Sequence, residues 1–156
     1  GDIRTHKTEE TSMTARTLRE VVAHQKVLKA ASSMTVREAA IKMAEQKVGA
    51  MLIHDKDRLT GIFTERDVLN RVVAKKLDPD TTTLAQVMSP DPRTISADKP
   101  LSHALVMMYE GGYRHVPVVD GSKVIGMVSA RDALGQELVE FEDELERRDH
   151  LTEIMI

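Results

Sequence analysis

The sequence has no cysteine and no tryptophan, and only 3% of its 156 residues are aromatic. The absence of cysteine excludes disulfides, thiolate metal ligands and cysteine nucleophiles, and it fits the reducing cytoplasm. So few aromatic side chains leave little surface on which the bases of single-stranded nucleic acid could stack. Lys and Arg total 22 against 25 Asp and Glu, so the net charge of −3 provides no positive field for nucleic acid or an anionic membrane.

Long apolar runs are also absent. No segment approaches the roughly 20 apolar residues that span a bilayer, and the N-terminus has no apolar stretch typical of a secretory signal. With 41% hydrophobic and 30% charged residues, the composition is that of a protein with a buried core. We therefore expect a cytoplasmic protein of one domain, or two small ones, that binds neither nucleic acid nor a membrane.

The patterns of common catalytic sites are missing as well. The chain has no glycine-rich phosphate loop ending in Gly-Lys-Ser or Gly-Lys-Thr, no His-Glu-x-x-His and no Gly-x-Ser-x-Gly. Its six histidines do not have the spacing of metal ligands. We predict neither catalytic residues nor a metal site, and therefore a protein that is not an enzyme.

The most informative feature that is present is an internal repeat. The segment Gly-Ile-Phe-Thr-Glu-Arg-Asp at 61–67 recurs as Gly-Met-Val-Ser-Ala-Arg-Asp at 126–132, which is 65 residues later. Further upstream, Thr-Leu-Arg-Glu-Val-Val at 17–22 matches Thr-Leu-Ala-Gln-Val-Met at 83–88. The domain boundaries that we predict are a disordered arm or expression remnant at 1–14, repeat 1 at 15–76, a linker at 77–83, repeat 2 at 84–140 and a C-terminal helical extension at 141–156.

Hydrophobic periodicity changes in the same order within each repeat. Apolar residues at i, i+3, i+4 and i+7 predict helices near 36–44 and 101–108. Short apolar runs separated by turn residues predict a hairpin after each helix. The strands that we expect are 50–53 and 59–63 in repeat 1, 116–119 and 124–128 in repeat 2, and short extended segments at 27–28 and 94–95.

Each repeat is therefore a β-α-β-β-α unit, and the fold class is α/β in the broad sense, more strictly α+β. One unit has too little sheet to cover its helices, so we expect the two repeats to pack about a pseudo-two-fold axis. Leu134, Leu138, Phe141 and Leu145 form an apolar stripe in an acidic segment, which predicts a C-terminal amphipathic helix. This helix either covers its own domain or makes a dimer contact.

The repeated motif ends where a strand leads into a helix. Thr64-x-x-Asp67 and Ser129-x-x-Asp132 fit a capping box, in which a hydroxyl and a carboxylate satisfy the free amides of the first turn. A binding role is the alternative, since a helix start attracts phosphate and a carboxylate can accept hydrogen bonds from two ribose hydroxyls.

Arginines next to the motif favour a ribose-phosphate site. Arg66 and Arg131 each precede the motif aspartate, and repeat 2 adds Arg114 and His115 at the start of its strand. Repeat 1 has Gly49-Ala50 at the corresponding place. We therefore expect the two sites to differ in phosphate affinity.

These residues resemble a known family. The Gly-h-h-[Thr/Ser]-x-x-Asp signature twice, Val-Met-Ser-Pro-Asp-Pro-Arg-Thr-Ile at 87–95 and Arg-His-Val-Pro-Val-Val-Asp at 114–120 together resemble a tandem pair of CBS domains (cystathionine-β-synthase domains), a Bateman module. The resemblance covers about residues 17–140. It implies an adenine-nucleotide ligand bound in the clefts between the repeats, with AMP the first candidate and ADP, ATP, NAD(H) or S-adenosylmethionine as others.

The resemblance also implies which residues bind. Asp67 and Asp132 would hold the ribose, and Thr64 and Ser129 would hold sugar or phosphate oxygens. Thr94 would meet the base in the cleft formed with the first motif. The remaining ligand-binding residues that it implies are Ile62 and Met127 on the adenine, and Arg66, Arg114, His115 and Arg131 on phosphates.

The function implied is a stand-alone regulatory module in signal transduction. It would sense energy or redox state, change conformation on binding and act on a separate, unknown partner, as a homodimer. The alternative is a purely structural dimerisation module in which both motifs are only helix caps and no ligand is physiological.

Overall fold

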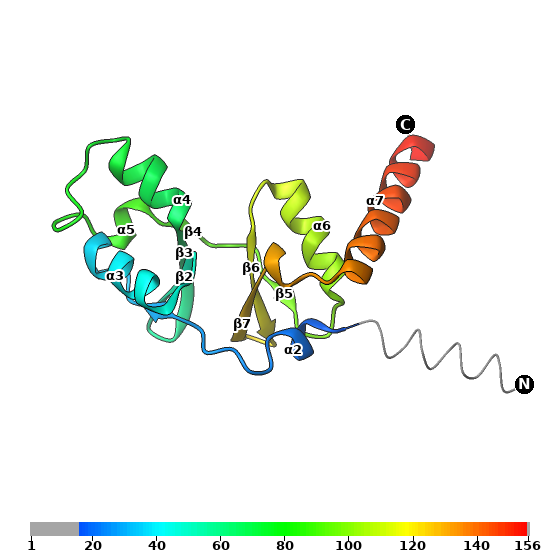
Figure 1. Cartoon of the computed structure of the whole chain (residues 1–156), viewed down its shortest axis with the longest axis horizontal. Helices are drawn as coiled ribbons and strands as arrows, with labels where there is room; N and C mark the ends of the chain where they lie inside the picture. Colours follow the sequence, from blue (N-terminus) through cyan, green and yellow to red (C-terminus); the bar gives the residue numbers. More distant parts are fainter. Residues whose placement is uncertain (1–15, 156) are drawn as a thin grey trace, which may run out of the picture. The chain divides into compact units, whose positions relative to one another are not determined.

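The computed structural model describes residues 16–155, with the side chains at 135, 136 and 150–155 excepted. The arm expected at 1–14 lies outside the described residues. The described chain divides into two compact units, one made of residues 26–93 and the other of the residues up to Gln25 together with those from Thr94 onward. Each unit contains one small sheet with helices against it (Figure 1).

The unit of residues 26–93 is built on a four-stranded sheet in the order β1-β2-β3-β4. Strand β1 is parallel to β2, whereas β3 is antiparallel to both of its neighbours, β2 and β4. The elements are β1 (Lys29–Ala30), α3 (Val36–Gln46), β2 (Ala50–Asp55), β3 (Arg58–Thr64), α4 (Glu65–Asp67), the π-helix η1 (Val68–Val73), α5 (Leu84–Val87) and β4 (Ser89–Pro90).

The second unit has a three-stranded sheet in the order β5-β6-β7, with β5 parallel and β7 antiparallel to β6. Its elements are α2 (Leu18–Val21), β5 (Ile95–Ser96), α6 (Leu101–Gly111), β6 (His115–Asp120), β7 (Lys123–Ser129), the 3-10 helix η2 (Ala130–Asp132) and α7 (Gly135–Met155). Two sheets, the helices and the C-terminal helix confirm the predicted α+β fold. Among the described residues, no helix is both long and apolar enough to span a membrane.

Helix α3 illustrates how the local sequence sets these elements. The hydroxyl of Thr35 accepts a hydrogen bond from the Glu38 amide at 3.2 Å and so begins the helix. Lys47 ends it in the left-handed region, with φ of 55°. Of the face predicted from the i, i+3, i+4, i+7 spacing, Val36, Ala39 and Met43 are buried, whereas Ala40 is half-buried and Ala44 is exposed.

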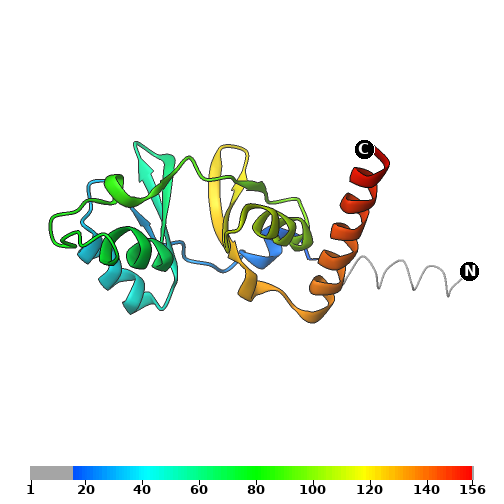
Figure 2. The same ribbon diagram turned by 90° about the horizontal axis from the view of Figure 1, so that it is seen from above.

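The compact units do not follow the order of the sequence repeats. Helix α2 begins the first repeat, yet Leu18 and Val22 belong to the core of the unit that contains β5, β6 and β7. Helix α5 begins the second repeat, yet Leu84 and Val87 belong to the core around β1, β2 and β3. The first helix of each repeat therefore packs with the sheet of the other, and Figure 2 shows α2 in blue below α6.

The segment expected as a linker, 77–83, packs closely against the start of α3. Arg37 donates to Asp80 at 2.5 Å, and the Val36 amide donates to the Thr82 carbonyl at 2.9 Å. Thr82 is buried. The turn residues of this segment thus fix its path over the α3 N-terminus.

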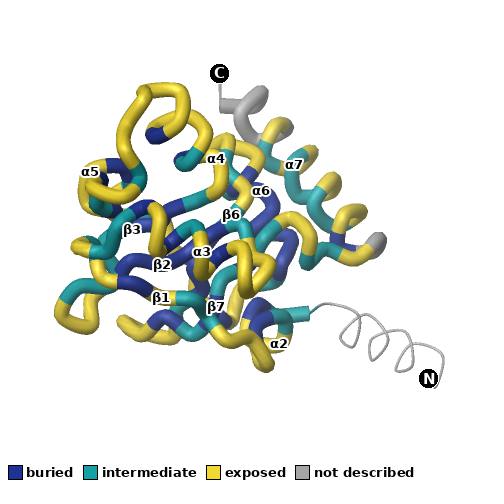
Figure 3. Tube along the Cα trace, turned by 60° about the vertical axis from the view of Figure 1, so that its left-hand side comes forward, coloured by how far each residue is buried: buried dark blue, intermediate teal, exposed yellow. Residues whose placement is uncertain are grey.

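Helix α7 lies beside α6 (Figure 1). Phe141 packs on the unit's core and meets Tyr109 edge to face, with ring centroids 6.1 Å apart. Leu134 and Leu138, from the same predicted stripe, are exposed, and Figure 3 shows how α7 alternates between intermediate and exposed residues. The helix therefore covers its own unit through part of the stripe.

Candidate nucleotide site

The Gly-h-h-Thr-x-x-Asp segment of the first repeat forms the end of β3 and the turn of α4. The Thr64 amide donates to Oδ2 of Asp67 at 2.9 Å, and the Asp67 amide donates to the Thr64 hydroxyl at 3.3 Å. This reciprocal pair is the predicted capping box. Its geometry directs the Asp67 carboxylate back toward the end of the strand.

Asp67 has a second partner. Its Oδ1 lies 3.5 Å from Nε of Arg71, one turn further along, and Nη1 of the same arginine donates to the carbonyls of Val87 at 3.1 Å and Met88 at 2.9 Å. Only 8% of Asp67 is exposed. Both carboxylate oxygens of Asp67 are therefore engaged within this unit.

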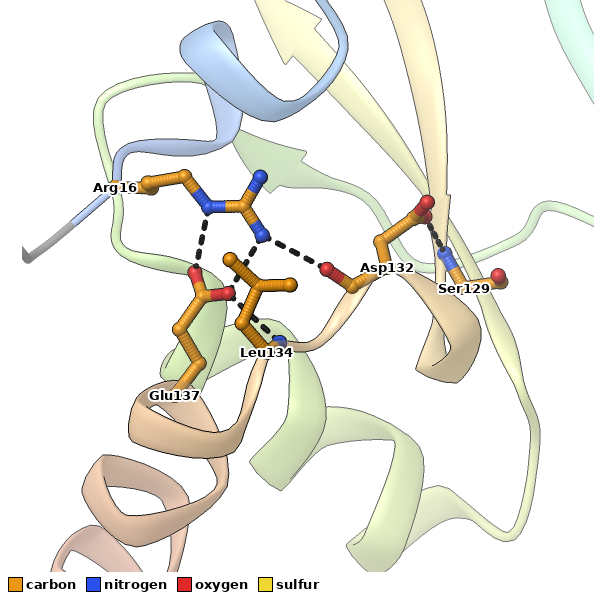
Figure 4. Close-up of polar contacts among 5 residues, drawn as sticks. All are labelled: Arg16, Ser129, Asp132, Leu134 and Glu137. Atoms are coloured by element: carbon orange, nitrogen blue, oxygen red, sulfur yellow. Dashed lines mark hydrogen bonds and ion pairs between the residues drawn. The ribbon is translucent and has the colours of Figure 1, made fainter.

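The equivalent carboxylate of the second repeat is more open. The Ser129 amide donates to Oδ2 of Asp132 at 2.8 Å (Figure 4). Oδ1 of Asp132 accepts no hydrogen bond from the described residues, and the residue is only half-buried. After Asp132 the backbone becomes extended at Ala133, with ψ of 133°, so the helical turn ends there instead of continuing as α4 continues into η1. The second strand of the repeat 2 hairpin was expected to lead straight into a helix at Ser129, and the structure instead has the single 3-10 turn η2 followed by α7.

Strand pairing brings the other predicted residues of this unit to one end of its sheet. His115, the first residue of β6, is directly opposite Ser129, the last residue of β7. Arg114 comes just before β6 and Thr94 just before β5, which runs parallel to β6. His115 and Ser129 thus meet where the Asp132 turn begins, with Arg114 next to His115 in sequence, whereas Thr94 is level with Pro117, two residues further along β6.

Arg114 and Arg131, two of the basic residues predicted to bind phosphate, are exposed, and neither has a side-chain partner among the described residues. Exposed arginines in the same unit as an open carboxylate suit a ligand that carries both hydroxyls and a phosphate. Met127 lies two residues before Ser129 on β7, opposite Pro117.

In the other unit, Ile62, Thr64, Arg66 and Asp67 follow one another along β3 and α4. Ile62 is buried between Leu52 and Ser89 of the neighbouring strands, whereas Arg66 is exposed. The structure thus brings the predicted residues together as two sets, one in each unit.

Glu65 is a residue that the sequence interpretation missed. A Cβ atom on Gly49 would lie 3.0 Å from Oε1 of Glu65, so this carboxylate sits at the start of β2. Ala130 occupies the matching position in the second repeat. The negative charge of Glu65 disfavours phosphate at the first motif. This difference could have been found in the sequence, by comparing Thr-Glu-Arg-Asp at 64–67 with Ser-Ala-Arg-Asp at 129–132.

Gln25 is a second residue that was missed. Its Nε2 donates to the Met127 carbonyl at 2.7 Å, and its Oε1 accepts from the Met127 amide at 2.9 Å. The side chain therefore satisfies the outer edge of β7 much as Ser89 in β4 pairs with Ile62 on β3. No pattern in the sequence pointed to this pairing.

The described residues contain no group of three His, Asp or Glu side chains arranged to hold a metal ion. The chemistry available at these motifs is instead that of hydrogen-bond acceptors at a helical turn with arginines beside them. Such an arrangement suits the binding of a ligand that carries hydroxyl and phosphate groups.

Comparison with known proteins identifies the repeated unit. The profile of the CBS domain matches residues 18–74 and again residues 84–137. The Arabidopsis thaliana CBS domain-containing protein CBSCBSPB1 is 41% identical over 95 residues, which make up 61% of this chain and 18% of that protein. The chain thus spans less than a fifth of the length of this relative.

Solved structures give the same result. The CBS domain protein PAE2072 from Pyrobaculum aerophilum, complexed with AMP, has a TM-score of 0.73 and 26% identity, and the match covers 82% of this chain and 98% of that chain. A hexameric CBS-CP12 protein from bloom-forming cyanobacteria also has a TM-score of 0.73 and 26% identity, with coverage of 87% and 81%.

Proposed function

Because the chain belongs to the CBS domain family, we propose that it is a regulatory module that binds an adenine nucleotide, with AMP as the first candidate. The likeness to a CBS domain protein complexed with AMP supports this ligand class. ADP, ATP, NAD(H) and S-adenosylmethionine share the adenosine group and are the alternatives to be tested.

The observation that carries the proposal is the open carboxylate of Asp132. One oxygen is fixed by the Ser129 amide at 2.8 Å, while the other has no hydrogen-bond donor among the described residues. A carboxylate held in this way is ready to accept hydrogen bonds from the two hydroxyls of a ribose without rearrangement. Binding therefore costs little side-chain entropy at Asp132, because the hydrogen bond from the Ser129 amide already fixes the conformation of this side chain.

The phosphate is assigned to the basic residues of the same unit. Arg131 adjoins the ribose carboxylate in sequence, and Arg114 and His115 lie at the start of β6, opposite Ser129. Arginine side chains recognise phosphate oxygens in pairs, so Arg114 and Arg131 provide most of this affinity. Met127 is assigned to the base.

The first motif is assigned a weaker role. Asp67 is already bonded to Thr64 and Arg71, and Glu65 repels phosphate near Gly49. A ribose there has to displace Arg71 before it gains the carboxylate. Ile62 and Arg66 remain the residues assigned to adenine and phosphate at this motif.

Regulation requires that the nucleotide favour one conformation over another, since equal affinity for both shifts nothing. We assign the response to a partner protein that recognises the nucleotide-bound conformation, and the active form to a homodimer. Oligomers occur in this family, as the hexameric cyanobacterial neighbour shows for its own chain.

A thermal-shift screen with AMP, ADP, ATP, NAD(H) and S-adenosylmethionine tests the proposal. A ligand at a hundred times its Kd stabilises the folded state by about 2.7 kcal/mol, which is readily detected as a higher Tm. The proposal predicts a selective shift for adenosine ligands and none for guanosine monophosphate. A folded protein whose Tm responds to none of them supports the alternative, a structural dimerisation module with helix caps only.

A further inference from the structure

The feature that the proposed site does not use is a pair of charges beneath the Asp132 turn. Arg16 donates from Nε to Glu137 at 3.2 Å and from Nη2 to the same carboxylate at 2.6 Å. Only 2% of the Glu137 side chain is exposed, whereas 32% of the Arg16 side chain is. Figure 4 shows the guanidinium between the end of the 3-10 turn and the start of α7.

Arg16 also bonds directly to the site's own turn. Its Nη2 donates to the backbone carbonyl of Asp132 at 2.8 Å. In a continuing helix, the backbone amide of a later residue would donate to the Asp132 carbonyl. Because the backbone turns extended at Ala133, the helix supplies no such amide, and Arg16 takes its place.

Glu137 also accepts a hydrogen bond from a free backbone amide at the start of α7. Its Oε1 accepts from the Leu134 amide at 3.0 Å, which is the position of a capping glutamate in the first turn of α7. The Arg16 guanidinium therefore joins the last carbonyl of one turn to the capping carboxylate of the next. The hydrogen bonds that Arg16 donates to the Glu137 carboxylate raise the pKa of Arg16, so the arginine stays charged.

We propose that Arg16 and Glu137 are positioning residues for the nucleotide, which hold the Asp132 turn in its binding conformation and join it to α7. The inference rests on the proposed function. Neither side chain needs to touch the ligand. Without Arg16, the Asp132 carbonyl loses its side-chain donor and the Glu137 carboxylate keeps only the Leu134 amide, so the turn samples other conformations and binds AMP less well.

The same contacts link the ligand to α7. A ribose bound to the Asp132 carboxylate also restricts the motion of the Asp132 carbonyl. Through that carbonyl it restricts Arg16 and the capping residue Glu137. AMP binding should therefore slow amide hydrogen exchange in the first turn of α7, and this slowing should depend on Arg16.

The test compares the wild-type chain with Arg16→Gln and Glu137→Gln by calorimetric titration with AMP, together with the Tm of each ligand-free protein. The control is Arg19→Gln, because Arg19 lies in the same segment and pairs with Asp98 and Asp120 without contacting the Asp132 turn. Glu137→Gln keeps a carbonyl oxygen for the Leu134 amide, so α7 can still begin there.

The expected result is an AMP affinity about tenfold weaker in Arg16→Gln, within the range usual for coupled sites, a smaller loss in Glu137→Gln, partial rescue in Arg16→Lys and no change in Arg19→Gln. AMP should slow exchange at 134–138 in the wild type and not in Arg16→Gln. Equal AMP affinities in the wild type and Arg16→Gln would overturn the positioning role alone. A wild type that binds no adenosine ligand would overturn the proposed function and this inference with it.

Discussion

A Cβ atom on Gly126 would lie 2.5 Å from the Cβ atom of Val22. The glycine of the second motif is thus required by packing, because helix α2, which begins the first repeat, approaches β7 at this point. Gly61 is likewise close to Met88, because a Cβ atom on Gly61 would lie 2.4 Å from Sδ of Met88. Both glycines leave room for the helix that each unit receives from the other repeat.

Gly126→Ala is therefore predicted to destabilise the protein by about 1–3 kcal/mol, the usual cost of overpacking a core. Gly61→Ala should cost less, because Met88 is flexible and can move its sulfur away. Chemical denaturation measures both values. The double variant Val22→Ala with Gly126→Ala should recover part of the loss, and a double variant that is merely the sum of the two single losses would contradict the packing explanation.

The two motif aspartates should differ in their effect on folding. Asp67→Ala removes the partner of both Thr64 and Arg71 at a buried position, so we expect a loss of about 2 kcal/mol. Asp132→Ala removes one capping bond at a half-buried position, and we expect about 1 kcal/mol. Urea denaturation without ligand measures the difference. Equal losses would show that the ion pair with Arg71 contributes nothing.

Arg131→Ala and Arg114→Ala should affect the phosphate rather than the nucleoside. Each variant is predicted to weaken AMP binding by about 1.5–3 kcal/mol, as expected for a charged hydrogen bond, and to leave adenosine affinity nearly unchanged. Paired titrations with AMP and adenosine provide the measurement. If adenosine affinity falls as far as AMP affinity, the arginines act on the fold and not on the phosphate.

The stability of the unit with β1 to β4 should depend on the ionisation of His54. Burial lowers the pKa of His54 below its ordinary value of 6.5, and the charge of Lys29 adds to this, against the opposing effects of Asp57 and Asp55. The Nδ1 atom is buried with no hydrogen-bond partner among the described residues. The folded state therefore favours neutral histidine, whereas the unfolded chain takes up a proton near pH 6.5.

The sign follows from proton linkage. The contribution of His54 to stability is full above the unfolded pKa and falls as the pH drops below it, because the unfolded state then binds more protons. Between about pH 7.5 and about pH 5.5 the wild type should lose more stability than His54→Gln. Parallel pH profiles for the two proteins would show that His54 is not responsible.

Much of the fold could be predicted from the sequence, because periodicity is a local signal. The spacing of Val36, Ala39 and Met43 identified the buried face of α3, and short apolar runs separated by turn residues placed both hairpins. The exchange of α2 and α5 between repeats could not be predicted in this way. Residues 17–22 have the same apolar pattern as residues 83–88 in the second repeat. No local signal indicates which sheet a four-residue helix will cover.

The residues of the candidate site were predictable where the motif repeats, as at Asp67 and Asp132. The differences between the copies were only partly visible. The absence of Arg114 and His115 from the first repeat was evident, but the contact of Arg71 with Asp67 was not. Arg16 and Glu137 gave no signal, because a charged residue near a terminus or in an acidic helix is typical of a solvated surface.

The measurement that tests the central claim most directly is a calorimetric titration of the full chain with AMP, repeated on Asp132→Ala and with Asp67→Ala as the matched control. Binding by the wild type, lost or strongly weakened in Asp132→Ala and reduced less in Asp67→Ala, is the result predicted for a nucleotide bound by the second motif. Equal affinity in the wild type and Asp132→Ala, with both proteins folded, would contradict the account.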